Sequence, residues 1–314
     1  MDFLVHLDDL AVVRISGEDA AGFLHTQLSN DIAGMGPDDA RLAAYCNPKG
    51  RMLGSLVLWR ESPDAAAPLL ALVKADLLEP LLKRLRMFVL RAKVRFDIAE
   101  LEAWGASTAA HPPAGAWRVE RREAFTLVSA PAAPGGPMRH WVIAAAGTDA
   151  AALAGKLGLP PEDGGRAWHA QDVEAGLGWV EQANAELFIP QSLNYDLVGG
   201  VSFTKGCYPG QEIVARAHFR GTVKRRGVPG RCPASDAVLQ AGADIFDANR
   251  PGSPAGRIIN AALIGDTGER AGGWRLFMEV GLADIGRADF RAVSPEGPVI
   301  SLLPPPYPLE VQEG

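Results

Sequence analysis

The chain has 314 residues, a formal net charge of −6 and a hydrophobic fraction of 47%, which is the composition of an ordinary soluble globular protein. Its length exceeds what one small core organises, so two or three structural units are expected. The acidic balance argues against wholesale binding to nucleic acids or membranes but leaves room for local basic patches. The three cysteines have no paired spacing, and neither a signal peptide nor a membrane span is evident, so we expect a cytoplasmic protein.

Helical periodicity first follows Ser16, where Ala20, Phe23, Leu24 and Leu28 recur at the spacing of one helix face. Further along, strands are predicted over 52–59 and 69–74, a helix over 76–89, strands over 125–129 and 141–145, and helices near 149–157 and 168–177. Strands mixed with helices over the first ~225 residues indicate an α+β fold rather than a regular βαβ array.

A segment rich in Gly and Pro at 227–233 marks the clearest boundary in the chain. Beyond it, short apolar runs are separated by Gly, Pro and Asp turns; these runs cover 243–246, 256–263, 274–280, 290–293 and 299–303. The pattern predicts a small all-β sandwich or barrel of ~85 residues. We therefore expect one domain over 1–226 and a C-terminal β-domain over 227–314, with the proline-rich stretch 304–308 extended along it.

The segment 205–212, with the sequence KGCYPGQE, is the strongest candidate for a site. It combines a cation, a thiol, an aromatic ring, an amide and a carboxylate, while two glycines and a proline restrict the backbone. Nearby cations would favour the thiolate of Cys207 and make it a candidate redox or functional thiol, whereas a buried structural cysteine is the competing interpretation. A polar surface turn is the alternative for the segment as a whole.

Cations gather between residues 203 and 226, where the only acid is Glu212. They are Lys205, Arg216, Arg220, Lys224, Arg225 and Arg226. In an acidic protein this cluster would draw an anionic ligand to one place, although a solvated face explains it equally well.

Several common sites are excluded by spacing. The sequence has no H-E-x-x-H, no G-x-S-x-G, no Walker A loop and no G-x-G-x-x-G after a strand, and its six histidines are scattered, so no metal site is predicted. The helix predicted over 168–177 offers a flat apolar surface in Trp168 and a carboxylate in Glu174. A core tryptophan beside a solvated glutamate is the plainer interpretation of that pair.

The stretch 205–221 resembles the signature of the YgfZ-type folate-binding proteins, a family related to the aminomethyltransferase of the glycine cleavage system and to mitochondrial iron–sulfur assembly factors. Further similar stretches are 15–20 with Phe23, Leu24, Asn30 and Asp31, then 46–50, Trp168 with 174–176, 188–191 and 303–309. The resemblance covers nearly the whole chain except 99–161.

The resemblance implies a ring of α+β subdomains, two of them intertwined within 1–226, capped by a small C-terminal β-barrel around a ligand channel. It also implies tetrahydrofolate or another reduced folate as ligand, and support of iron–sulfur cluster assembly or repair and, through iron–sulfur enzymes, of tRNA modification. The implied partners are the iron–sulfur assembly machinery or its client proteins; neither a membrane nor direct nucleic-acid binding is expected.

From the resemblance we expect eight residues to contact the folate: Trp168, Glu174, Lys205, Tyr208, Gln211, Arg216, Arg220 and Leu10. Glu174 would accept the neighbouring N–H groups of the pterin, and the pterin and aminobenzoyl rings would pack on Trp168. The anionic glutamate tail would favour Lys205 or the Arg216 and Arg220 pair.

Two departures from the family are informative. Aminomethyltransferases carry an acid in the strand after the first polar turn, where this chain has Gly54 and Ser55, so ordinary glycine-cleavage activity is not expected. Leu10 stands where the best-known YgfZ-type members have a tryptophan that helps to hold folate, so one half of an aromatic clamp is absent. The alternative functions are a one-carbon transferase or demethylase with its acid elsewhere, and an RNA- or protein-binding module that uses 203–226.

Overall fold

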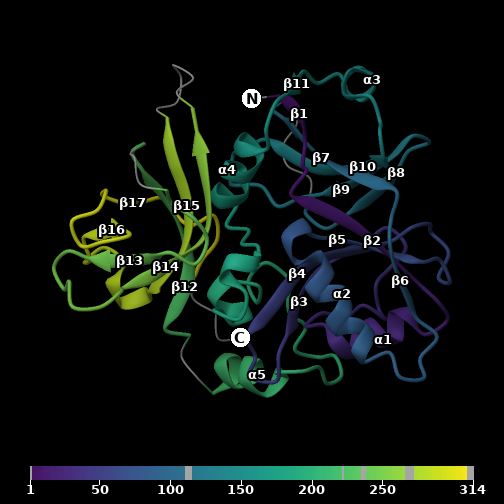
Figure 1. Ribbon diagram of the computed structural model, residues 1–314, viewed down its shortest axis with the longest axis horizontal. Coiled ribbons are helices and arrows are strands. Elements are labelled where there is room, and N and C mark those ends of the chain that lie inside the picture. Colours follow the sequence, from purple (N-terminus) through teal and green to yellow (C-terminus); the bar gives the residue numbers. More distant parts are fainter. Residues whose placement is uncertain (1, 110–114, 221–222, 235–237, 266–271, 310–314) are drawn as a thin grey trace.

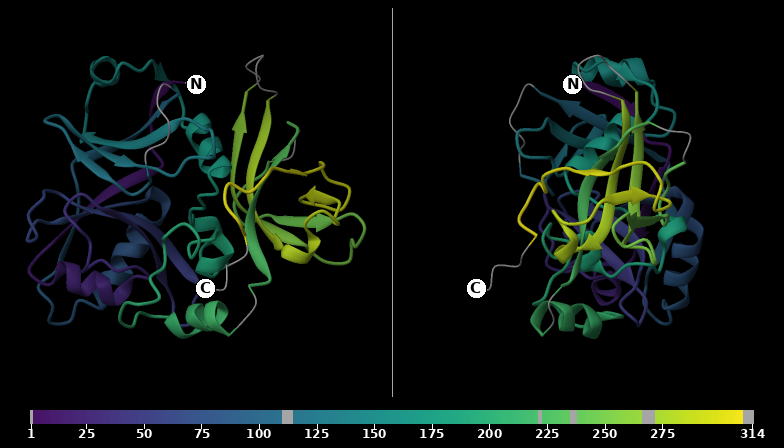
Figure 2. Two further views of the ribbon diagram at one scale, coloured as in Figure 1. Left: turned by 180° about the vertical axis from the view of Figure 1, so that it is seen from behind. Right: turned by 90° about the vertical axis from the view of Figure 1, so that its left-hand side faces the viewer.

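The computed structural model describes residues 2–109, 115–220, 223–234, 238–265 and 272–309. Its strands form three sheets, and helix α4 (Arg166–Glu174) lies between the C-terminal sheet and the other two (Figure 1). The view from behind shows the same separation, with the C-terminal strands as a unit on one side (Figure 2). No helix among these residues is long and apolar enough to span a lipid bilayer.

The two N-terminal sheets are intertwined along the chain. The first has the strand order β11-β1-β7-β10-β9-β8 and the second β3-β4-β5-β2-β6. The strands of the first are β1 (Phe3–His6), β7 (Leu101–Thr108), β8 (Val119–Arg121), β9 (Phe125–Ser129), β10 (Met138–Ala145) and β11 (Pro161–Glu162); those of the second are β2 (Leu10–Ser16), β3 (Ala40–Cys46), β4 (Met52–Arg60), β5 (Leu69–Lys74) and β6 (Arg95–Ile98). Because β2–β6 fall between β1 and β7 in the sequence, the chain crosses between the two sheets twice.

The C-terminal strands form a six-stranded, nearly closed sheet of barrel-like shape, with the order β16-β13-β14-β15-β12-β17 (Figure 1). They are β12 (Arg225–Cys232), β13 (Asp244–Asp247), β14 (Gly256–Ile264), β15 (Gly273–Gly281), β16 (Phe290–Ala292) and β17 (Ser301–Leu302). The predicted fold class, α+β units with a small barrel-like C-terminal sheet, is confirmed.

The segment predicted as a boundary, 227–233, is mostly a strand. It belongs to β12, which pairs with β15 from Arg225 to Cys232, so the C-terminal sheet begins just before the predicted boundary. A Cβ on Gly227 would lie 2.4 Å from Cζ of Phe277, so glycine is required there by the packing of a core ring. The Gly and Pro content of this strand therefore reflects close packing rather than a linker.

Four of the five described helices follow the predicted apolar stripes, whereas the helix over 211–219 was not predicted. The described helices besides α4 are α1 (Ala20–Gln27), α2 (Leu78–Met87), α3 (Ala150–Leu157) and α5 (Gln211–Phe219). Helix α2 buries Leu81, Leu82 and Leu85 against the second sheet. Helix α3 begins at an Asp149 side chain that accepts a hydrogen bond from the Ala152 N–H, and it ends at Gly158 in the left-handed conformation.

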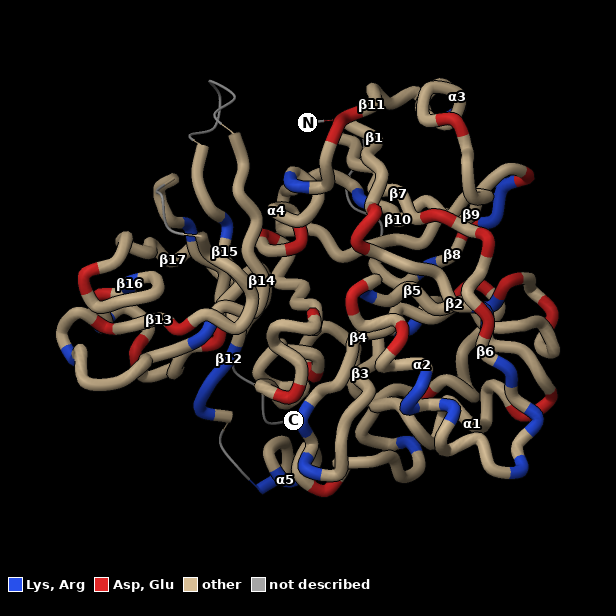
Figure 3. Tube along the Cα trace, in the orientation of Figure 1, with Lys and Arg blue, Asp and Glu red and all other residues tan. Residues whose placement is uncertain are grey.

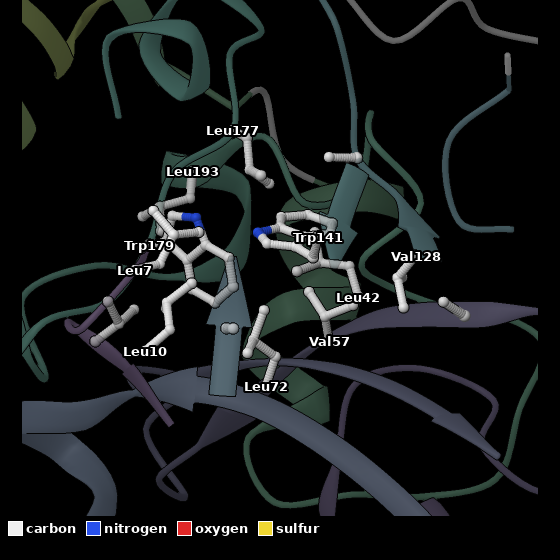
Figure 4. Close-up of a cluster of buried hydrophobic side chains, with 14 of the residues drawn as sticks. Leu7, Leu10, Leu42, Val57, Leu72, Val128, Trp141, Leu177, Trp179 and Leu193 are labelled. Atoms are coloured by element: carbon white, nitrogen blue, oxygen red, sulfur yellow. The ribbon is translucent and has the colours of Figure 1, made fainter. Parts of the chain in front are cut away.

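One hydrophobic core extends through all three sheets. It contains Trp141 of the first sheet, Leu72 of the second and Phe277 of the C-terminal sheet, all buried. Figure 4 shows the indole rings of Trp141 and Trp179 within this cluster, with Leu10 beside Trp179. Since this one cluster joins the three sheets, their relative positions are set by side-chain packing and not by the connecting segments alone.

Helix α4 is fixed to the first sheet by Trp168, whose side chain is fully buried. One contact is with β7, where a Cβ on Gly105 would lie 2.5 Å from Cε3 of the indole, so only glycine fits. The Arg139 guanidinium of β10 lies 4.0 Å from the centre of a Trp168 ring and 2.5 Å from Oδ1 of Asp172. This buried ion pair and cation–π contact define the position of the helix.

The C-terminal tail is fastened across the molecule by Tyr307. Its hydroxyl donates a hydrogen bond to the Gly176 carbonyl at 2.6 Å and accepts one from Nδ2 of Asn194 at 3.1 Å. Gly176 has a φ of 66°, and a Cβ there would lie 2.6 Å from the tyrosine hydroxyl. The tail therefore closes onto the end of α4.

A network of charges joins the first and second sheets to α4. Lys74 Nζ lies 2.6 Å from Asp9 and 3.7 Å from Glu181, and His169 Nε2 lies 3.2 Å from Asp9. Burial lowers the pKa of His169, but hydrogen bonds with Asp172 and Asp9 outweigh it and raise this pKa to about 9. Burial raises the pKa of Asp9, yet His169 and Lys74 together hold it below its ordinary value.

The fastening of the tail is tested by Tyr307→Phe. The substitution removes the hydroxyl that two buried partners, the Gly176 carbonyl and the Asn194 side chain, use, so the free energy of unfolding should fall by about 1–2 kcal/mol in urea titrations followed by tryptophan fluorescence. The control is Tyr208→Phe, because the hydroxyl of that buried tyrosine has no hydrogen-bond partner among the described residues. The control should change stability by less than about 0.5 kcal/mol. Equal effects of the two substitutions would contradict the role of the tail contact.

The His169 network predicts a pH dependence of stability. Because the folded-state pKa of about 9 lies above the ordinary 6.5, the stabilisation is fully present below pH 6.5 and is lost as the pH rises through 9. The difference is on the order of 3 kcal/mol. Unfolding titrations between pH 6 and 10 should show this loss in the wild type and a flatter profile in His169→Gln. If the stability of the wild type and of His169→Gln changed with pH in the same way, His169 would not be the source of this pH dependence.

Candidate functional site

Side chains of α4 line two separate cavities. The first, with a volume of about 530 Å³, is lined by α4, by the turn between β1 and β2, by the end of β5 and by β14, including Asp9, Lys74, His169 and Asn260. The second, of about 880 Å³, is lined by Glu174 of α4, by β12 and β15, by Ala133 and Pro134, and by the tail from 301 to 306. Both volumes lie in the range of small-molecule sites.

The first cavity is negatively charged. Its described lining includes five carboxylates, against three cations even when His169 is protonated. The carboxylates are those of Asp8, Asp9, Asp76, Asp172 and Glu181, and the cations are Lys74, Arg166 and His169. An anionic ligand would be repelled here, and most of these groups already serve the network that joins the sheets to α4.

The second cavity has more positive than negative side chains in its described lining. Among its described lining residues the charged ones are Glu174, Arg231 and Arg275. The two arginines lie directly opposite each other on β12 and β15, and Glu174 Oε1 lies 3.5 Å from Nε of Arg275. Like charges that face each other across a sheet repel, so an additional anion in this cavity would be favourable. A carboxylate and surplus positive charge thus face one space.

The segment 205–212 lies beside the second sheet, away from the lining of both cavities. Lys205 donates hydrogen bonds to the carbonyls of His25 and of Leu28, the latter at 2.7 Å, at the end of α1. Its ammonium also lies 4.8 Å from the centre of the Tyr208 ring. Burial lowers the pKa of Lys205 to about 8. Because its amino group donates to two carbonyls at the end of α1, the lysine caps that helix.

Close packing fixes the second half of this segment. Gly210 has a φ of 81°, and a Cβ there would lie 2.5 Å from the Asn47 carbonyl oxygen. Tyr208 is buried, whereas Cys207 is an exposed free thiol. The sequence had left two interpretations of Cys207 open, and the structure contradicts the buried one. Burial raises the pKa of the neighbouring core thiol, Cys46, to about 12.

The cations predicted around residues 203–226 divide into two groups. Arg225 and Arg226 belong to β12 and form ion pairs with Glu279 and Asp196, the second of them fully buried. Arg216 and Arg220 are exposed on α5 and at its end. No single anion site gathers them in the described structure.

The predicted folate-binding residues therefore lie in three places. Trp168 and Leu10 belong to the core, and Glu174 lines the second cavity. The other five, Lys205, Tyr208, Gln211, Arg216 and Arg220, belong to the segment beside the second sheet and to α5 with its C-terminal end. The binding roles given to these residues stay predictions.

Two residues of the second cavity were not predicted. Arg231 lies in the stretch interpreted as a boundary, and Arg275 lies inside a strand predicted from its apolar neighbours. Only the register of β12 with β15 brings them together.

The positions where aminomethyltransferases carry an acid are committed to packing. Gly54 is buried in β4 against Leu81, and the Ser55 hydroxyl contacts the Tyr195 hydroxyl at 2.7 Å and accepts a hydrogen bond from the Val180 N–H. In the described part of the chain, no group of three His, Cys, Asp or Glu side chains is arranged to hold a metal ion.

Comparisons with known proteins identify the family to which this chain belongs. No family model matches the sequence. The tRNA-modifying protein YgfZ of Escherichia coli O45:K1 (strain S88) is 32% identical over 254 residues, covering 76% of each chain. That of Escherichia coli O139:H28 (strain E24377A) is 32% identical over 234 residues, covering 71% of this chain and 69% of the relative.

A solved structure shares the fold. The glycine cleavage system aminomethyltransferase T of Bartonella henselae superposes with a TM-score of 0.71 over 96% of this chain and 84% of its own, at 16% identity. The fold is thus that of an aminomethyltransferase, while the extent and level of sequence identity settle the closer relationship. The chain belongs to the YgfZ family.

Proposed function

We propose that the protein binds a reduced folate, such as tetrahydrofolate, in the second cavity and thereby supports iron–sulfur enzymes that modify tRNA. The observation that carries the proposal is the charge of this cavity, where one carboxylate and two arginines face a space of about 880 Å³. The relatives' name, tRNA-modifying protein, supports a role in tRNA modification. The aminomethyltransferase fold supports a folate as the ligand.

The chemistry of the lining suits each part of a folate. The Glu174 carboxylate would accept the adjacent N–H groups of the pterin in a paired arrangement. Arg275, which pairs with Glu174, would orient that carboxylate, and Arg231 would hold the carboxylates of the glutamate tail, a task for which a guanidinium group is well shaped. The tail prolines 304–306 and Leu303 provide apolar surface for the rings between these ends. A bound folate would supply one-carbon chemistry.

Trp168 acts as a positioning residue in this proposal. Its faces are occupied by Gly105 and Arg139, so it holds α4, and with it Glu174, at the wall of the cavity. Leu10 and Lys205 likewise act through packing and helix capping and not by direct contact with folate.

We propose an accessory role and not carbon transfer, because the second sheet has no acid at the positions where aminomethyltransferases carry one. The Ser55 hydroxyl bonds with Tyr195 and Val180, and Gly54 has no side chain, so neither supplies the acid that the family of aminomethyltransferases uses. We propose that the exposed Cys207 is the contact through which the folate-bound protein serves iron–sulfur partners in the cytoplasm.

Folate binding is tested by isothermal calorimetry with tetrahydrofolate. In Glu174→Gln a charge-assisted contact is replaced by a neutral one, so the dissociation constant should rise roughly 10- to 100-fold. The matched control is Asp8→Asn, an exposed carboxylate on the wall of the first cavity, which should bind as the wild type does. Loss of affinity in Asp8→Asn with none in Glu174→Gln would move the folate to the first cavity and refute the proposal.

The role of Cys207 is tested in cells that lack the native protein. Cys207→Ala should fail to restore the activity of iron–sulfur enzymes and the level of the tRNA modifications that depend on them, although it should bind folate normally. Cys46→Ala removes a buried thiol and serves as the control, which should restore both. Full rescue by Cys207→Ala would end the proposed contact.

A further inference from the structure

A second basic region lies outside the segment 203–226. Between Glu79 and Asp97 the sequence has six cations and no acid, in a protein whose net charge is −6. They are Lys83, Arg84, Arg86, Arg91, Lys93 and Arg95. These residues run from the second half of α2 into β6, the edge strand of the second sheet.

The fold brings these cations onto one surface. Lys83 and Arg86 are exposed one turn apart on α2, and Arg86 donates a hydrogen bond to the Phe96 carbonyl of β6 at 2.7 Å. The end of the helix therefore lies against the edge strand that carries the exposed Arg95. Lys and Arg positions of α2 are seen close together in Figure 3. We call the exposed residues of 83–95 the α2–β6 surface.

Most of the charge on this surface is not neutralised. Lys83, Arg91 and Arg95 form no ion pair with any described carboxylate, whereas Lys93 pairs with the exposed Glu18 at 2.9 Å. The exposed acids beside the surface are Glu18, Asp19, Glu79 and Asp97. Three uncompensated cations on a strongly basic stretch favour contact with a polyanion.

Large apolar side chains are exposed among these cations. Met87, Phe88 and Leu90 are 68%, 46% and 86% exposed. An exposed aromatic ring beside basic groups suits an unpaired base, which stacks on the ring while its phosphates meet the cations. An anionic membrane is the competing partner, but the apolar face of α2 is buried in the second sheet and is not free to insert.

We propose that the α2–β6 surface is a docking site for RNA, with its cations on the phosphate backbone and Phe88 against an unpaired base. The choice of RNA over other polyanions rests on the proposed function in tRNA modification. The sequence-based expectation of no direct nucleic-acid binding considered only the net charge and residues 203–226. In this account the protein both carries folate and contacts the RNA.

The test is fluorescence anisotropy of the full chain with an unmodified tRNA transcript at several salt concentrations. The variant combines Lys83→Gln, Arg91→Gln and Arg95→Gln, which removes exposed charge without disturbing buried groups. The slope of log affinity against log salt concentration should fall by about 2–3, since each lost phosphate contact removes about 0.7–0.9. The matched control combines Arg216→Gln, Arg220→Gln and Lys224→Gln on the other basic segment and should retain the wild-type slope.

Three results would overturn the proposal: no measurable tRNA binding by the wild type, an unchanged slope in the α2–β6 variant, or loss in the control alone. Wild-type binding to phosphatidylglycerol vesicles in the absence of RNA binding would assign the surface to membranes instead. Calorimetry of the same variant with tetrahydrofolate should give wild-type affinity, and Glu174→Gln should retain tRNA binding. These two measurements separate a failure of RNA docking from a failure of folate binding.

Discussion

The burial of Trp168 against Gly105 and beneath the Arg139 guanidinium positions α4, and the rest of the molecule is arranged around this helix. On one side α4 directs His169 and Asp172 into the first cavity, and Glu174, two residues after Asp172, points from another side of the helix into the second. A shift of the helix would disturb both cavities together. The Arg139–Asp172 ion pair makes such a shift costly, because separating the pair would leave a charge buried without a partner.

The two cavities differ in charge, and this difference leads us to propose different tasks for them. The first holds an excess of carboxylates, most of which bind Lys74 or His169 and so join the sheets. The second holds two arginines that face each other across β12 and β15 with Glu174 nearby. We propose that the second receives a ligand with N–H donors for Glu174 and carboxylates for Arg231. In the neighbouring sheet, the Ser55 hydroxyl accepts a hydrogen bond from the Tyr195 hydroxyl and is therefore committed to packing.

Much of the fold could be predicted from the sequence, because apolar residues recur along the chain at the spacing with which helices and strands bury one face. The predicted ranges 69–74 and 125–129 coincide with β5 and β9, and 52–59 with all but the last residue of β4. β12 was missed because Gly227 is required by the ring of Phe277, a contact from a distant strand. For the site, resemblance led to Glu174, but Arg231 and Arg275 meet only through strand register. Lys205 illustrates the opposite limit, since its partners are backbone carbonyls of α1, which side-chain patterns do not reveal.

The central claim is that folate occupies the cavity formed by α4, the C-terminal sheet and the tail. A crystal structure of the protein soaked with tetrahydrofolate tests it most directly. The account predicts pterin density beside the Glu174 carboxylate, with the glutamate tail at Arg231. Density beside His169 and Asp172, or at the segment 205–212, would contradict it.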